Sequence, residues 1–155
     1  MSEIPVAEIT RVQELIYELK IEHVMVRDVI TCSPDLSIRD LKELLRVKRI
    51  SGVPVVDEGR LVGMVSIENL IQALERGALD TCVRDHMTTN VQTVRAEDSV
   101  VSAVNLFAQY GFGRFPVVNA EDVLVGILTK GDIVRGLLRQ MEVRWHAEEI
   151  QRYRA

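Results

Sequence analysis

The sequence predicts a mixed α/β fold made of two copies of one β-α-β-β-α unit. The stretch SGVPVVDEGRLVGMVSIEN at residues 51–69 returns as GRFPVVNAEDVLVGILTKGD at residues 113–132. Upstream positions recur at a constant offset of 62, as Met25 and Met87 do. Two copies are too few for a solenoid, so we expect a pair of small subdomains packed on each other. Because a unit of roughly 60 residues buries little surface alone, the copies should share one core.

Composition and charge narrow the classes of function. Of the 155 residues, 47% are hydrophobic and 27% are charged, as in an ordinary globular α/β protein. The net charge of −4 argues against general nucleic-acid binding, which needs clustered Lys and Arg, but it is compatible with one bound nucleotide. The first residues carry no basic leader, and no apolar run approaches the roughly 20 residues that span a bilayer. We therefore expect a cytoplasmic protein that does not enter a membrane.

Local signals place the first repeat at residues 22–77. The expected elements are a short helix at 22–25, a strand at 29–32, a helix from 37 to about 50, strands at 53–56 and 61–66, and a helix at 68–76. Ser37-Ile-Arg-Asp40 is a capping-box sequence that starts the first long helix. Gly59 lies in the turn between the two strands, at a position expected to be left-handed. Gly77 is suited to the end of the last helix.

The second repeat, at residues 78–138, follows the same order. The expected elements are a short helix at 80–86, a strand at 91–94, a helix at 99–110, strands at 114–118 and 123–128, and a helix from 130. Residues 1–21 are predicted to form an amphipathic helix, because Ile9, Val12, Ile16 and Leu19 follow one another at helical spacing. Residues 139–155 should continue the last helix as a largely charged extension.

The tandem order of these motifs resembles a pair of cystathionine-β-synthase (CBS) domains, known as a Bateman module. The resemblance rests on Pro54-Val-Val-Asp57, Gly126-Ile-Leu-Thr129-Lys-Gly-Asp132 and their duplicates, and it covers residues from about 22 to 138. It implies two repeats packed sheet to sheet by pseudo-twofold symmetry, with clefts between them that bind adenine-containing ligands. AMP, ADP, ATP and S-adenosylmethionine are the ligands implied. The resemblance also implies that modules dimerise.

Thr129 and Asp132 are the leading candidates for ligand binding. They lie at the start of the last helix, where free N–H groups and the helix dipole favour anionic or hydroxyl-rich ligands. A carboxylate at this place can accept both vicinal hydroxyls of a ribose, and Thr129 can reach ribose or phosphate. Thr129-x-x-Asp132 is also a capping-box sequence, which would only stabilise the helix. The residues alone leave both roles open.

The two repeats differ at this site. Ser66-x-x-Asn69 occupies the equivalent position in the first repeat, and Asn69 cannot make the charge-assisted hydrogen bonds that a carboxylate makes. Arg114 lies where some nucleotide-binding CBS domains carry a phosphate-binding arginine, and its counterpart is Gly52. Both differences favour the site that contains Asp132. An ordinary surface role for Arg114 is the alternative.

Other candidates come mostly from the resemblance. Lys130 is a second group that can neutralise phosphate, or else a solvated lysine of the first helical turn. The walls of the adenine pocket would be formed by residues that also suit a core: Val29, Thr31, Val53, Pro54, Met87, Pro116 and Ile127.

Catalytic and metal-binding patterns are missing from the sequence. His23, His86 and His146 are far apart, the two cysteines form no CxxC pair, and there is no P-loop or GxGxxG. We therefore predict a regulatory adenine-nucleotide sensor that is not an enzyme and needs no cofactor or metal. It is expected to form a homodimer and to act on a downstream effector domain or protein. A ligand-free homodimerisation module is the main alternative, and a small enzyme or metal-binding protein is a weaker one.

Overall fold

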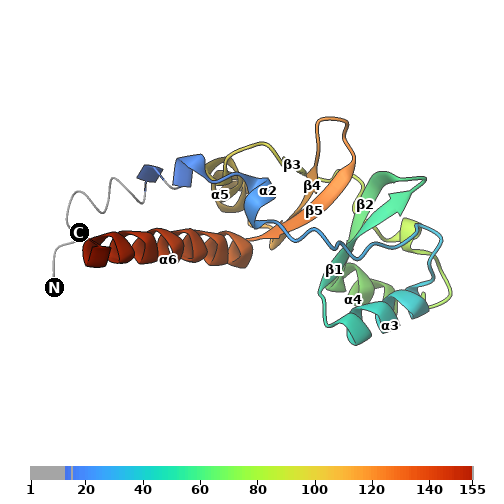
Figure 1. Ribbon diagram of the computed structural model, residues 1–155. Coiled ribbons are helices and arrows are strands. Elements are labelled where there is room, and N and C mark those ends of the chain that lie inside the picture. Colours follow the sequence, from blue (N-terminus) through green and yellow to red (C-terminus); the bar gives the residue numbers. More distant parts are fainter. Residues whose placement is uncertain (1–12, 15, 155) are drawn as a thin grey trace. The chain divides into compact units, whose positions relative to one another are not determined.

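The computed structural model describes residues 13, 14 and 16–154, with only the backbone described for residues 143–154. The chain divides into two compact units. The central unit comprises Asp28–Thr93 and Ala120–Leu124, and the terminal unit comprises Val94–Asn119, Val125 onward and the described residues before Asp28. Figure 1 traces their helices and strands. Ile9 and Val12 of the predicted N-terminal helix lie outside the described residues.

The central unit contains a hairpin and two helices. Its elements are α3 (Ile38–Lys48), β1 (Gly52–Asp57), β2 (Arg60–Ser66), α4 (Ile67–Glu75) and the 3-10 helix η1 (Val83–Asp85). The strands β1 and β2 pair antiparallel, and the turn between them has Glu58 and Gly59 at φ 50° and 79°. At the start of α3, Ser37 Oγ accepts a hydrogen bond from the Asp40 N–H at 3.1 Å. The predicted turn and helix cap are therefore confirmed.

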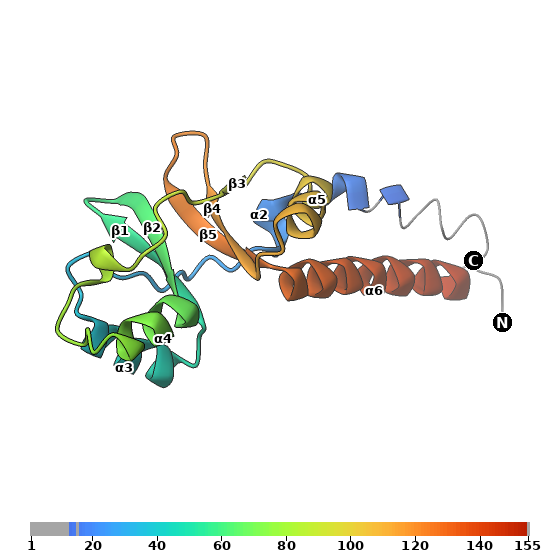
Figure 2. The ribbon, with the colours of Figure 1, turned by 180° about the vertical axis from the view of Figure 1, so that it is seen from behind.

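The helices α3 and α4 lie side by side over the hairpin, as both views of the ribbon show (Figures 1 and 2). Apolar side chains from all four elements meet there. The buried cluster consists of Cys32, Ile38, Leu41, Leu45, Val53, Val55, Val65, Leu70, Ala73 and Val83. This cluster is the core of the central unit.

The terminal unit contains a three-stranded sheet and helices. Its elements are α2 (Ile21–Val24), β3 (Val94–Arg95), α5 (Val100–Tyr110), β4 (Arg114–Val118), β5 (Leu124–Thr129) and α6 (Lys130–Arg154). The strand order is β3-β4-β5, with β3 parallel to β4. The helix α5 ends at Tyr110, as predicted, and Gly111 follows it with φ 67°. Together the two units confirm the predicted mixed α/β class.

The first residues of each repeat pack in the unit that contains the hairpin of the other repeat. Val26 bonds in both directions with Ile127 of β5, with N···O distances of 2.9 Å, and Thr88 pairs in the same way with Met64 of β2. Met25 of the first repeat and Ile21, just before that repeat, are buried in the terminal unit. The buried residues form two clusters, one in each unit. The exchanged segments supply apolar surface that a repeat alone would lack.

The first strand of each repeat is shorter than predicted. Residues 29–31 have no strand assignment, and only Cys32 forms a bridge, parallel to Val55. In the second repeat the strand is β3, at residues 94–95, where 91–94 was expected. After Val26 the chain leaves the sheet of the terminal unit, and it reaches the hairpin of the central unit only at Cys32. After Thr88 it leaves that hairpin, and it reaches the three-stranded sheet only at Val94. The β-branched residues in these two stretches therefore extend neither sheet. Such side chains favour a half-buried surface as much as a paired strand.

Gly136 allows α2 to pack closely against α6. A Cβ placed on Gly136 would lie 3.0 Å from Val24 Cβ and still nearer to Val24 Cγ1. We expect Gly136→Ala to lower the free energy of unfolding by about 1–3 kcal/mol through overpacking, although alanine alone favours a helix by about 1 kcal/mol. Urea unfolding measures the change.

A second variant isolates the steric cause. Adding Val24→Ala to Gly136→Ala removes the clash, so the combined loss should be smaller than the sum of the two single losses. A gain in stability from Gly136→Ala alone would show that this helix contact is not close.

Candidate functional site

The junction between β5 and α6 holds the two leading candidates. The Thr129 N–H donates to Asp132 Oδ2 at 2.8 Å, and the Asp132 N–H donates to Thr129 Oγ1 at 3.2 Å. This reciprocal pair is the capping box that the sequence predicts. The Asp132 residue is only 7% exposed, which is unusual for a carboxylate. The junction therefore holds a buried acidic group in a fixed orientation.

Arg135 is a member of the site that sequence reasoning missed. Its Nη2 donates to Asp132 Oδ1 at 2.7 Å, from three residues further along α6. Burial of a carboxylate is costly unless the group is paired and hydrogen-bonded. Here each carboxylate oxygen has a donor, one from the backbone and one from a guanidinium. The i, i+3 spacing of Asp and Arg at a helix start is the signal that points to this pair.

The equivalent junction between β2 and α4 is neutral. Asn69 Oδ1 accepts from the Ser66 N–H and the Ser66 hydroxyl, both at 2.9 Å, and the Asn69 N–H donates to Ser66 Oγ at 3.4 Å. Gln72 stands where the second repeat has Arg135. The amide closes the cap without a charged group. The two junctions thus share their backbone geometry and differ in charge.

Four further candidates of the second repeat lie in the same unit as Asp132. Lys130 is exposed, and its Nζ lies 5.9 Å from the centroid of the Phe107 ring, close enough for a cation–π contact. Arg114 is half-buried at the start of β4, and Pro116 is buried two residues later. Ile127 is half-buried in β5, and its backbone pairs with that of Val26. All four residues belong to the terminal unit.

The candidates of the first repeat lie in the central unit, together with Met87 of the second repeat. Val53 and Pro54 are fully buried in β1, as the core alternative predicts. Met87 is half-buried beside β2, where a Cβ on Gly63 would lie 3.0 Å from Met87 Cγ. Thr31 is exposed. The structure therefore places six of the predicted residues, Asp132 among them, in the terminal unit. The other seven, among them Asn69 and the half-buried Val29, lie in the central unit.

Thr31 lines a groove that the sequence did not indicate. The groove has a volume of about 530 Å³ and runs between residues 31–36 and α3. Its lining residues are Thr31, Cys32, Ser33, Leu36, Asp40, Glu43, Leu44, Val47 and Lys48.

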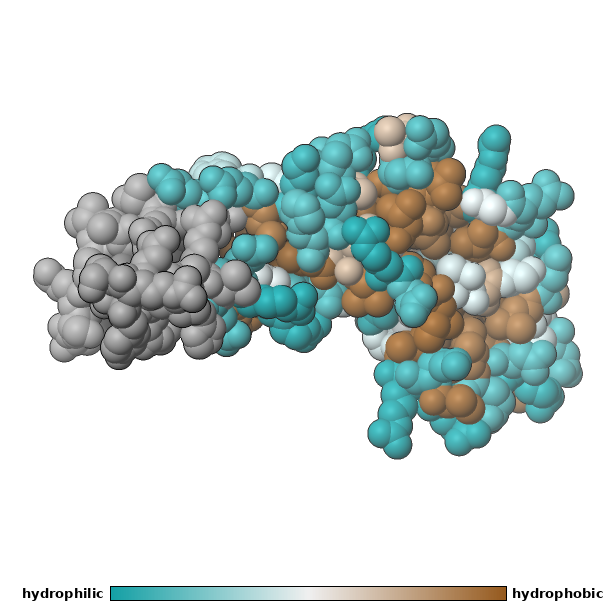
Figure 3. Space-filling model, viewed as in Figure 1, coloured by the Kyte–Doolittle hydropathy of each residue, from teal (hydrophilic) through white to brown (hydrophobic). Residues whose placement is uncertain are grey.

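Burial raises the pKa of the Cys32 thiol to about 11, so this sulfur is a poor nucleophile at neutral pH. A hydrogen bond from Arg46 lowers the pKa of Glu43. Figure 3 shows hydrophobic patches beside hydrophilic side chains in this part of the surface.

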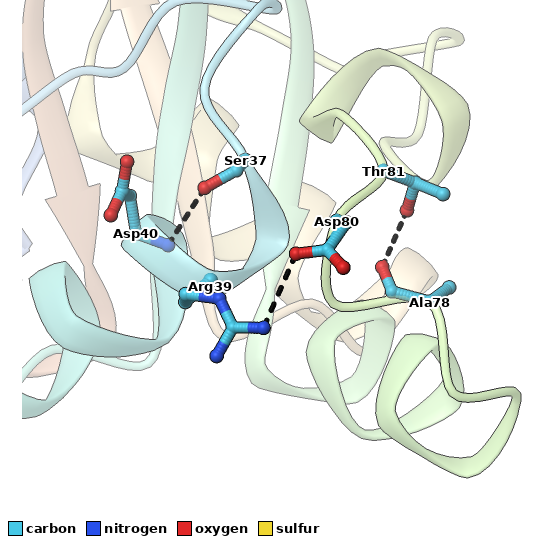
Figure 4. Close-up of polar contacts among 6 residues, drawn as sticks. All are labelled: Ser37, Arg39, Asp40, Ala78, Asp80 and Thr81. Atoms are coloured by element: carbon cyan, nitrogen blue, oxygen red, sulfur yellow. Dashed lines mark hydrogen bonds and ion pairs between the residues drawn. The ribbon is translucent and has the colours of Figure 1, made fainter.

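The start of α3 is occupied by the chain itself. The Ile38 and Arg39 N–H groups donate to the carbonyls of Thr81 and Leu79 at 2.9 and 3.0 Å. Arg39 also pairs with Asp80 at 3.2 Å, and the Thr81 hydroxyl donates to the Ala78 carbonyl (Figure 4). The first-turn donors that an anion would use are therefore already bonded.

The part of the chain that the structure describes contains neither a metal-binding cluster nor a membrane-spanning helix. Within it, no group of three or more His, Cys, Asp or Glu side chains is placed to hold a metal ion. In the same residues no helix combines the length and the apolar character needed to cross a bilayer.

Comparison with known proteins gives consistent matches. The family model described as CBS domain matches residues 21–76 and 83–139. Inosine-5′-monophosphate dehydrogenase of Korarchaeum cryptofilum is 37% identical over 112 residues, which cover 72% of this chain and 23% of that protein. The chain spans between 23% and 51% of the length of three curated relatives that it matches.

Two solved structures with bound adenine compounds are similar to this chain. The structure of CBSX2, a protein of Arabidopsis thaliana, in complex with AMP has a TM-score of 0.71 and 32% identity, covering 79% of this chain and 98% of that one. The CBS domain pair of protein MJ0100, in complex with 5′-methylthioadenosine and S-adenosyl-L-methionine, has a TM-score of 0.68 and 28% identity, covering 75% and 93%.

Proposed function

Because the chain belongs to the family of CBS-domain proteins, with two such domains in tandem, we propose that it is a regulatory module that binds an adenine nucleotide at the β5–α6 junction. The observation that carries this proposal is Asp132, a carboxylate 7% exposed and oriented by the Thr129 N–H at the start of a 25-residue helix. The ligands proposed are AMP, ADP, ATP and S-adenosylmethionine.

The chemistry of the junction suits an adenosine ligand. The vicinal hydroxyls of a ribose are two donors, and a carboxylate accepts both in charge-assisted hydrogen bonds. The N-terminus of α6 favours a phosphate, and Lys130 and Arg114 add positive charge on neighbouring elements. The AMP complex of CBSX2 and the S-adenosylmethionine complex of MJ0100 support this choice, because both ligands contain an adenosine ribose.

The proposed role is regulation rather than catalysis. A ligand changes a protein's activity only when it binds two conformations with different affinity. The helix α6 begins at the proposed site and continues to Arg154, so it can carry a change at the ligand to an effector. The effector would be another domain or another protein in the cytoplasm. That the chain spans 23% of a relative named as an inosine-5′-monophosphate dehydrogenase agrees with a module that serves larger proteins.

A second candidate function is homodimerisation without a ligand. Ile67, Ile71 and Leu74 are 39–49% exposed along α4, and Val134, Leu138 and Met141 are 42–54% exposed along α6. Each set follows a spacing of four and three residues, which makes one apolar stripe on a helix. A stripe in each repeat suits a second copy of this chain, because a twofold interface pairs a surface with itself. The dimer and the nucleotide site are compatible.

A thermal-shift series separates the two functions. We expect AMP, ADP, ATP or S-adenosylmethionine to raise the Tm by about 5–10 °C, since a ligand at 100 times its Kd adds about 2.7 kcal/mol. NAD serves as a bulkier adenine-containing comparison. Sedimentation velocity of the same samples reports the oligomeric state. A dimer whose Tm is unmoved by each of the five compounds at millimolar concentration would refute the nucleotide proposal and favour the second candidate.

A further inference from the structure

We propose that Arg135 makes the Asp132 site selective for phosphorylated adenosine ligands. The guanidinium covers the Asp132 carboxylate. When the ribose of a ligand binds this carboxylate, the displaced guanidinium pairs with the phosphate of the same ligand. The inference rests on the proposed nucleotide function of the same junction. It assigns to Arg135 a role in specificity beyond that of stabilising α6.

The position of the guanidinium places its charge at the start of α6. Arg135 Nη2 is 2.7 Å from Asp132 Oδ1, and a Cβ placed on Gly131 would lie 3.1 Å from Arg135 Nη1 and 3.3 Å from Nη2. The group therefore lies over the first turn, beside the residue between Lys130 and Asp132. Because Gly131 has no side chain, the guanidinium fits there. This is the end of the helix to which a phosphate is attracted.

Burial shows which partner of the ion pair can move. The Asp132 side chain is 7% exposed and is held by the Thr129 N–H, whereas the Arg135 side chain is 64% exposed. The guanidinium thus lies on the solvent side of the carboxylate. A ribose that reaches Oδ1 from solvent has to replace it. Because an ion pair with an exposed arginine contributes little free energy, Arg135 loses little when it leaves Asp132 for a second anion.

The first repeat provides an internal comparison. Where the second repeat has Asp132 and Arg135, the first has Asn69 and Gln72, so the acid and its counterion change together. The cap at Ser66 and Asn69 closes with no guanidinium. A helix cap alone therefore does not require an arginine at this position. The arginine accompanies the carboxylate, the group that the proposed function assigns to the ribose.

The displacement has opposite consequences for nucleosides and nucleotides. Adenosine must break the ion pair and leaves the guanidinium with no new anion. AMP breaks the same pair but offers a phosphate, which a guanidinium binds in a bidentate manner. Arg135→Gln should therefore tighten adenosine binding and weaken AMP binding. The ratio of the two Kd values is the quantity that Arg135 controls.

Isothermal titration with adenosine and with AMP tests the proposal. In Arg135→Gln the ratio of the adenosine Kd to the AMP Kd should fall at least about tenfold from its wild-type value, because a charge-assisted contact exceeds a neutral one by about 1.4 kcal/mol, which is tenfold in Kd. Arg135→Lys should restore part of the ratio, since it keeps the charge but not the bidentate geometry. Gln72→Ala, at the equivalent position in the central unit, should leave the ratio unchanged.

The outcomes distinguish this inference from the proposed function. If the wild type binds AMP and the ratio is the same in Arg135→Gln, then Arg135 has no role in specificity while the nucleotide site stands. If the wild type binds neither adenosine nor AMP, the inference about Arg135 is wrong, and the nucleotide proposal is wrong as well when ADP, ATP and S-adenosylmethionine also fail to bind. A ratio taken within one variant is independent of the fraction of that variant that is folded, so a loss of stability cannot imitate the expected result.

Discussion

Asp132→Ala should weaken AMP binding at least about 100-fold. The ribose loses two hydrogen bonds to a charged group, each contributing about 1.5–3 kcal/mol, and 100-fold corresponds to about 2.7 kcal/mol. Asp132→Asn keeps the size of the side chain and reproduces the residue of the first repeat, so it should lose most of the same affinity. Isothermal titration of both variants with AMP measures the effect.

The matched control for this prediction is Asn69→Ala in the central unit. Both alanine variants remove a cap residue and should lower the free energy of unfolding by about 1 kcal/mol. Only Asp132→Ala should lose AMP binding. Equal losses of affinity at the two positions would contradict the assignment of the ligand to the β5–α6 junction.

Phe115→Ala should lower the free energy of unfolding by about 3–5 kcal/mol, because it leaves a large cavity in the core of the terminal unit. Phe115 has no exposed surface, and its ring centroid lies 4.7 Å from that of Phe107 and 5.8 Å from that of Phe112. A loss of this size is a large part of the stability of a small protein. Urea unfolding followed by circular dichroism measures it.

Phe112 is the control for the loss of an aromatic ring outside the core. It is 46% exposed and lies stacked against Tyr110 at the surface. Phe112→Ala should cost less than about 1.5 kcal/mol, because only an aromatic contact and a part of the buried area are lost. Similar losses for the two variants would show that Phe115 does not occupy the centre of the core.

Elements specified by local chemistry were predicted well. Ser37 caps its helix as expected, and Gly59, Gly77 and Gly111 have the positive φ that their positions in turns and helix ends require. The capping box of Thr129 and Asp132, which the residues alone left open beside a role in ligand binding, is local in the same way. Such features depend on residues that lie within four positions of one another, so a short pattern is sufficient.

The sequence pattern could not predict that the first residues of each repeat pair with a strand of the other repeat. Met25 and Met87 are equivalent in the repeat, and so are Gly63 and Gly126. In the structure Met25 packs on Gly126 and Met87 packs on Gly63. Because the repeats are alike, the pattern is equally compatible with pairing inside a repeat and pairing across repeats. Only long-range backbone pairing, which local propensity does not encode, decides between them.

The part of the site that was missed has a different cause. Thr129 and Asp132 were found by comparison with a motif, and the motif ends before Arg135. The joint change from Asp132 and Arg135 to Asn69 and Gln72 is visible in the sequence. This joint change indicates a functional difference only once the ion pair between Asp132 and Arg135 is known. An arginine three residues from an aspartate is otherwise common on exposed helices.

The most direct measurement compares AMP with 2′-deoxy-AMP on the wild type and on Asp132→Ala. If the Asp132 carboxylate binds the ribose diol, the wild type should bind AMP at least about tenfold more tightly than 2′-deoxy-AMP, because one charge-assisted hydrogen bond is lost. In Asp132→Ala the two ligands should bind equally. The same preference for AMP in both proteins would contradict a contact between Asp132 and the ribose.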